Sequence, residues 1–121
     1  MSSLIKEIPI KDIEGVSIGH AQDDTAKTGV SVIYFENGAQ AGCDISGGGV
    51  AARETLLTDP VTADNPLNAV VLSGGSAFGL AASDGVMRCL EEHDIGYQMC
   101  RKTPSFSYGD IRHVHRIYAS N

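Results

Sequence analysis

The stretch 68–95 constrains the fold most, because its hydrophobic pattern changes period within a few residues. Its apolar run at 69–72, Ala-Val-Val-Leu, predicts a short strand buried on both faces. Ser-Gly-Gly-Ser follows at 73–76, and from Ala77 onward apolar residues recur at the spacing of a helix. These are Phe78, Ala82, Val86, Cys89 and Leu90. The sequence therefore predicts a strand, a glycine turn and a helix over 68–93.

This turn has two interpretations. Serine favours a helix N-cap, glycine permits the positive φ of a sharp reversal, and the first turn of a helix presents unpaired N–H groups. An oxyanion or carboxylate site here would be lined by Ser73, Gly74, Gly75, Ser76, Phe78 and Gly79. A tight turn that binds no ligand explains the same residues, and the nucleophile-elbow, dinucleotide and P-loop patterns do not match.

Strands are also predicted upstream of this stretch. Residues 15–20 and 29–35 are rich in β-branched residues, and Asn37-Gly38 is the strongest short-range indication of a hairpin. With a return strand at 39–45, we expect strands within 15–45 to form a hairpin. A short helix is expected at 50–57, where Arg53 and Glu54 would form a surface pair of little energy. These elements together predict an α+β fold.

Composition excludes several classes of function. The net charge of −6 argues against a nucleic-acid surface, and no apolar run approaches the ~20 residues that cross a membrane. The N-terminus lacks the basic and apolar regions of a signal peptide. The three cysteines are an odd number without close pairing, as in reduced cytoplasmic thiols. We expect a cytoplasmic protein without a cofactor, in which Cys89 is a buried, inert thiol.

The composition changes near Tyr97. Residues 100–121 carry four basic side chains against the single acid Asp110, and they have no clear period. We therefore expect residues 1–97 to belong to one incomplete domain and residues 98–121 to be a divergent basic tail, whether frameshifted, truncated, unrelated or disordered. His113 and His115, with Asp110, could form a metal site, but surface histidines explain them without a metal, and we expect none.

Several short motifs occur in order along residues 15–97. They are Gly-Val-Ser-Ile-Gly-His-Ala at 15–21, Thr-Gly-Val-Ser-Val at 28–32, Ala-Gly-Cys-Asp at 41–44, Arg-Glu-Thr at 53–55, Asp-Pro at 59–60, Leu-Ser-Gly-Gly-Ser-Ala-Phe-Gly-Leu at 72–80 and Asp-Gly-Val-Met-Arg at 84–88. This series resembles peptidase family S58, the L-aminopeptidase/D-esterase enzymes. That family is related to β-peptidyl aminopeptidases and 6-aminohexanoate-oligomer hydrolases.

The resemblance implies an αββα sandwich similar to that of N-terminal-nucleophile hydrolases. It also implies a longer precursor that cleaves itself and frees an N-terminal Ser or Thr as nucleophile, with its α-amine as base. Substrates would be small peptides, amides or esters with a free amino group, and subunits would form homo-oligomers. No nucleic-acid or membrane partner is implied.

In such an enzyme the 73–79 turn would line the substrate pocket and help to hold the oxyanion. The nucleophile and the self-cleavage site would lie outside the matched residues, so we expect no catalytic residue in this chain and no activity from the chain alone. A non-enzymatic module that binds a carboxylate or phosphate at the 73–79 turn is the alternative.

Overall fold

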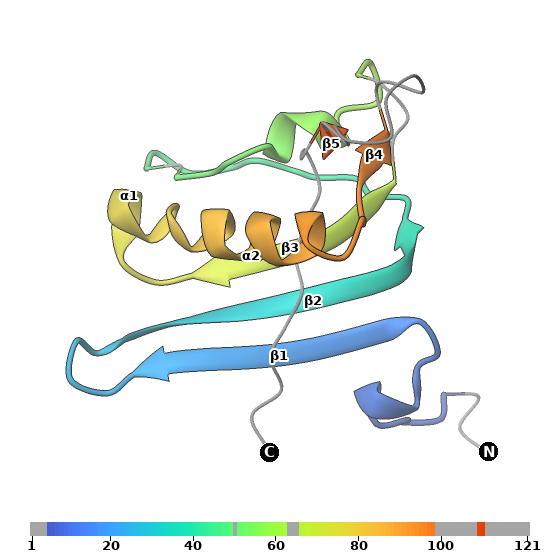
Figure 1. Cartoon of the computed structure of the whole chain (residues 1–121), viewed down its shortest axis with the longest axis horizontal. Helices are drawn as coiled ribbons and strands as arrows, with labels where there is room; N and C mark the ends of the chain where they lie inside the picture. Colours follow the sequence, from blue (N-terminus) through green and yellow to red (C-terminus); the bar gives the residue numbers. More distant parts are fainter. Residues whose placement is uncertain (1–4, 50, 63–65, 99–108, 111–121) are drawn as a thin grey trace.

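A three-stranded antiparallel sheet forms the centre of the protein (Figure 1). The computed structural model describes residues 5–49, 51–62, 66–98 and 109–110. The sheet contains β1 (Val16–Asp23), β2 (Thr28–Ala39) and β3 (Leu67–Ser73), with β2 in the middle. The β-branched residues of β2 suit a strand that is paired on both sides.

The β1–β2 hairpin reverses at residues 24–27. The Asp23 carboxylate accepts hydrogen bonds from the backbone N–H groups of Thr25 (2.9 Å) and Ala26 (2.8 Å). Lys27 completes the reversal in the left-handed region, with φ 54°. An aspartate that bonds to the backbone two residues ahead can replace a backbone turn, which explains why this polar segment forms the hairpin.

The hairpin predicted at Asn37-Gly38 is wrong. Strand β2 continues through both residues and ends at Ala39. Residues 40–45, which were expected to continue the return strand at 39–45, are not in a strand. Gly38 has φ +71°, and the pairing register between β2 and β3 shifts between Tyr34 and Ala39. A Cβ at Gly38 would lie 2.8 Å from the Pro66 Cβ. The glycine therefore permits the irregular pairing of β2 with β3 and the close approach of Pro66.

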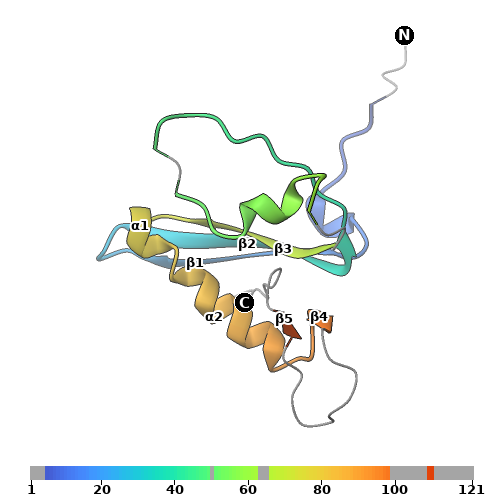
Figure 2. The same cartoon turned by 90° about the horizontal axis from the view of Figure 1, so that it is seen from above.

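Helices cover one face of the sheet (Figure 2). The helical segment consists of α1 (Ser76–Gly79) and α2 (Ala82–Glu91), not the single helix that the spacing predicted. Segments 40–49 and 51–62 run on the opposite side of the sheet. The strand, turn and helix predicted over 68–93 thus occur in that order, and the α+β class is confirmed.

The apolar face of α2 packs on the sheet as predicted for three of its residues. Val86, Cys89 and Leu90 are buried, and Leu90 is fully enclosed. Phe78 was expected on the same face, but 93% of its surface is exposed. Because α1 and α2 are separate helices, the helical spacing does not carry Phe78 onto the buried face of α2.

The register of the strands determines which residues meet α2. Val32 is paired with Val71 and Val30 with Ser73, so these four side chains share a face. Val32, Ala69 and Val86 form the buried cluster, with Val30 and Val71 packed beside it. The strand predicted at 69–72 is confirmed, but its burial on both faces is not.

Leu72 shows that β3 is not buried on both faces. It is paired with Ser31, and so lies on the sheet face opposite α2. There, 60% of its surface is exposed. Continuous apolar sequence did not distinguish a strand packed on one face from one packed on both.

The remaining elements are short. They are the 3₁₀ turns η1 (Ile10–Asp12) and η2 (Thr55–Thr58), and the paired strands β4 (Tyr97–Gln98) and β5 (Gly109–Asp110). The helix predicted at 50–57 is reduced to η2. Of the tail predicted at 98–121, all but Gln98, Gly109 and Asp110 lies outside the described residues. Within the described part, no helix is long and apolar enough to cross a membrane.

Candidate functional site

Backbone hydrogen bonds to β2 and within the turn hold the segment between β3 and α1. The N–H of Gly74 donates to the Gly29 carbonyl (2.9 Å), which extends the β2–β3 ladder past Ser73. Gly75 reverses the chain with φ +91°, and the Gly79 N–H donates back to the Gly75 carbonyl (3.1 Å). The positive φ expected of a glycine in this turn is therefore confirmed.

The predicted serine cap is wrong. Gly75 occupies the N-cap position of α1, and no side chain caps the helix. Ser76 is the first residue of α1 and has φ 54°, an unusual conformation for a residue with a side chain. The Ser73 hydroxyl donates instead to the Gly74 carbonyl (3.0 Å).

The glycines also have a purely structural reason to be small. A Cβ on Gly79 would overlap the carbonyl oxygen of Gly74 and would lie 2.9 Å from its carbonyl carbon. A Cβ on Gly74 would lie 3.0 Å from the Thr28 Oγ1. Close approach of the backbone to itself therefore explains Gly79, and the Thr28 hydroxyl limits the space at Gly74, without any ligand.

Only some backbone donors of the turn remain for a ligand. The Gly74 N–H bonds to Gly29 in β2 and the Gly79 N–H bonds to Gly75 within the turn, whereas no described group accepts from the N–H groups of Ser76 and Ala77. Because α1 has only four residues, its dipole is much smaller than that of a full helix. This weakens the alternative of a module that binds anions through a helix N-terminus.

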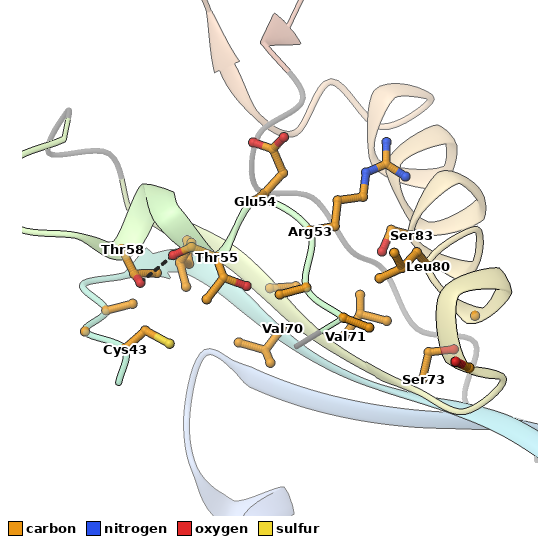
Figure 3. A pocket seen from close by; sticks show the side chains of 18 residues that line it. Cys43, Arg53, Glu54, Thr55, Thr58, Val70, Val71, Ser73, Leu80 and Ser83 are labelled. Atoms are coloured by element: carbon orange, nitrogen blue, oxygen red, sulfur yellow. Dashed lines mark hydrogen bonds between the residues drawn. The ribbon is translucent and has the colours of Figure 1, made fainter. Parts of the chain in front are cut away.

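A cavity of about 480 Å³ lies beside the turn, along β3 (Figure 3). Three of the predicted site residues line it: Ser73, Ser76 and Gly79. Its remaining walls come from β3, from segments 41–43 and 51–58, and from the chain entering α2. Apolar side chains such as Val70, Val71 and Leu80 share this cavity with the hydroxyls of Thr55, Thr58 and Ser83.

An ion pair joins two walls of this cavity. The Arg53 guanidinium donates to the Asp84 carboxylate at 2.5 Å, linking segment 51–58 to the first turn of α2. The arginine side chain is 35% exposed and the aspartate 64%. The predicted pairing of Arg53 with Glu54 is therefore replaced by a contact with a residue 31 positions away.

A second cavity, of about 400 Å³, lies on the other side of the turn. Gly74, Gly75 and Phe78 line it, together with residues of β1, β2 and the start of α2. Ser73 and Gly79 line both cavities. The six predicted residues are thus neighbours, but they divide between two cavities, with Ser76 facing only the first.

Other candidate residues lie apart from this turn. Cys89 is buried, as predicted, whereas Cys43 is exposed and lines the first cavity. The described residues contain no group of three His, Cys, Asp or Glu side chains able to hold a metal. Asp110 lies in β5, and His113 and His115 lie outside the described residues.

Arg53, Asp84, Thr55 and Thr58 line or border the first cavity but were not predicted as site residues. Their separation in the sequence hid their proximity, because no local period connects a loop to a helix 30 positions later. The only available indication was that Arg53 and Asp84 begin two of the short motifs that resemble the S58 family.

Comparison with known proteins gives one family and a consistent set of relatives. The profile of peptidase family S58 matches residues 9–106. An uncharacterized aminopeptidase of Mycobacterium leprae (strain TN) is 44% identical over 98 residues, which cover 74% of this chain and 27% of that protein. An uncharacterized aminopeptidase of Mycobacterium tuberculosis (strain H37Rv) is 43% identical over 98 residues, covering 74% and 28%.

A third relative has a more specific name. The 6-aminohexanoate-oligomer endohydrolase of Kocuria sp. (strain KY2) is 34% identical over 81 residues, covering 67% of this chain and 21% of that protein. The chain thus spans about a quarter of the length of the relatives it matches. Since the family profile covers most of the sequence, the chain belongs to peptidase family S58.

Proposed function

We propose that this chain is the N-terminal part of an autoproteolytic aminopeptidase or amidohydrolase that removes N-terminal residues from small peptides, amides or esters. The observation that carries this proposal is the S58 profile over residues 9–106. The names of the relatives support it, since they include aminopeptidases and a hydrolase of 6-aminohexanoate oligomers, which are linear amides.

The fold supports the same proposal at a coarser level. Helix α2 and the sheet supply one helical layer and one sheet layer. On the other face, Ile18, Ile33 and Val70 are adjacent by strand pairing and only half-buried, and Leu72 beside them is largely exposed. An apolar sheet face of this kind suits a second sheet, as an αββα sandwich requires.

The proposed mechanism gives this chain a binding role and no catalytic residue. The nucleophile would be the freed N-terminal Ser or Thr of a second chain, with its α-amine as base. The N–H groups of Ser76 and Ala77 are the donors proposed to hold an oxyanion, since no described group accepts from them, whereas the Gly74 N–H bonds to Gly29 and the Gly79 N–H to Gly75. The first cavity, which Ser76 lines, would then receive the substrate.

We extend the proposal to partners and compartment. A small peptide or amide would be the ligand, and the complete enzyme would be a homo-oligomer. A net charge of −6 disfavours a nucleic-acid partner, and the odd number of cysteines fits a reducing cytoplasm.

The experiment compares this chain with a version extended by the C-terminal part of a family relative. Both are incubated with a series of aminoacyl p-nitroanilides, and self-cleavage is followed by mass spectrometry. We expect the extended protein to cleave itself and release p-nitroaniline, and we expect the 121-residue chain to do neither. Turnover by the chain alone that survives repurification would contradict the assignment of the nucleophile to a missing part.

A further inference from the structure

In the described part of the chain, strand β3 is an edge strand of the sheet. Among the described residues it pairs with β2, and the first cavity lies along its other side. Unpaired strand edges present rows of N–H and C=O groups that can pair with another extended chain. The chemistry of this edge therefore depends on which backbone groups of β3 point outward.

The hydrogen bond between Gly74 and Gly29 determines that direction. Bonded and non-bonded residue pairs alternate along an antiparallel ladder. Because Gly74 donates to Gly29, the next bonded pairs toward the N-terminus of β3 are Leu72–Ser31 and Val70–Ile33. The N–H and C=O groups of Ala69, Val71 and Ser73 therefore point away from β2.

These three residues all line the first cavity. No described backbone group outside the strand bonds to their outward N–H and C=O groups. The edge from Ala69 to Ser73 extends about 14 Å at 3.4 Å per residue, so it offers a ladder for an extended segment of about four residues.

We propose that this edge binds the substrate backbone by strand addition: a short, extended peptide or oligoamide pairs with Ala69, Val71 and Ser73 in the first cavity. The proposal rests on the peptidase function proposed above and adds how the substrate is held. A short chain fits better than a whole additional strand, because segment 51–58 and the start of α2 flank the cavity and are joined by the Arg53–Asp84 ion pair. The volume of about 480 Å³ is within the range of small-ligand pockets.

Strand addition also predicts what the site selects. Main-chain hydrogen bonds give affinity that does not depend on the side chains, whereas pockets give specificity at alternate positions. An α-peptide repeats its inward-facing amides at the spacing of the outward groups of β3, whereas an oligomer with longer aliphatic units pairs one amide at a time. The apolar side chains of Val70, Val71 and Leu80 favour small aliphatic groups beside that backbone.

The test titrates the 121-residue chain with Ala-Leu-Ala-Ala amide, whose one large side chain disfavours slippage of the register. Two analogues carry an N-methyl group on either the second or the third residue. In an added strand only alternate N–H groups face the protein, so one analogue should bind about tenfold more weakly and the other within about twofold of the parent. Equal affinities for both analogues, or no binding of the parent at millimolar concentration, would overturn strand addition.

Two variants of the chain complement the peptides. Ser73→Pro removes an N–H that points outward and takes no part in the β2 ladder, whereas Ser73→Ala keeps that N–H and removes only the hydroxyl. We expect Ser73→Pro to weaken binding about fivefold and Ser73→Ala to leave it within about twofold. If Ser73→Pro does not fold, the N-methylated pair on the unmodified chain still decides the question.

Amide hydrogen exchange identifies what pairs with the edge of β3. With peptide present, the Val71 amide should become protected. Protection that appears without peptide and rises with protein concentration would make a second copy of the chain the occupant and would overturn the proposal. Hydrolysis by the extended protein tests the peptidase assignment separately, so either conclusion can fail alone.

Discussion

Gly79, at the end of the 73–79 turn, and Gly85, within α2, have opposite surroundings. A Cβ on Gly79 would overlap the Gly74 carbonyl, whereas a Cβ on Gly85, within α2, would meet nothing within 4 Å. We expect Gly79→Ala to lower the free energy of unfolding by about 1–3 kcal/mol, as in overpacked cores. Gly85→Ala should raise it by about 0.5–1 kcal/mol, because alanine is the better helix former.

Chemical denaturation of both variants measures this difference, and Gly85→Ala is the matched control for adding one methyl group. Equal free energies of unfolding for the two variants would mean that the turn accommodates the added methyl group without losing stability. Its glycines would then not be explained by the close packing of its backbone.

The substitution Ser76→Ala distinguishes a structural role of the Ser76 hydroxyl from a chemical one. Its side chain makes no capping bond and is exposed. Ser76→Ala should therefore change the free energy of unfolding by less than about 0.5 kcal/mol, instead of the ~1 kcal/mol typical of a lost cap. A loss of about 1 kcal/mol or more in thermal unfolding would show that the hydroxyl supports the turn after all.

At the level of elements, the β1–β2 hairpin depends on one carboxylate. Asp23 accepts two backbone hydrogen bonds in an exposed turn. We expect Asp23→Ala to lower the free energy of unfolding by about 1 kcal/mol, since the net contribution of such a bond, after exchange with water, is about 0.5–1.5 kcal/mol. Asp23→Asn keeps an acceptor oxygen and should recover most of the loss. If the alanine variant is as stable as the parent, the hairpin reversal does not depend on the hydrogen bonds to the Asp23 carboxylate.

The Arg53–Asp84 pair links segment 51–58 to α2. Because both side chains are partly exposed, a double-mutant cycle with Arg53→Ala and Asp84→Ala should give a coupling energy of no more than about 1 kcal/mol. That energy should fall toward zero in about 1 M salt, where the Debye length is about 3 Å. A coupling that salt does not change would point to packing of the arginine stem instead of charge.

For the whole molecule, stability depends on a small core beneath α2. Leu90 is fully buried, whereas Leu56 is 71% exposed. Leu90→Ala should lower the free energy of unfolding by about 2–5 kcal/mol, and Leu56→Ala by no more than about 0.5 kcal/mol. Thermal unfolding followed by circular dichroism compares them. Similar losses for both would show that segment 51–58 belongs to the folding core.

Local features of the sequence were sufficient where a single segment determines its own structure. The period change over 68–93 predicted a strand, a turn and a helix, and the burial of Val86, Cys89 and Leu90 followed from helical spacing. The ordered motifs identified the family, which the profile over 9–106 confirms. The residues proposed to bind substrate at 73–79 remain a prediction, because their proximity to two cavities does not test what they bind.

Tertiary structure decided what depends on residues distant in the sequence. Asn37-Gly38 matches a hairpin turn, but pairing of β2 with β3 and contact with Pro66 place it inside a strand. The partner of Arg53 is Asp84 because the fold places segment 51–58 beside α2. The outward groups of β3 depend on the register with β2. Spacing along a chain specifies local periodicity, whereas register and long-range contacts depend on which segments pack together.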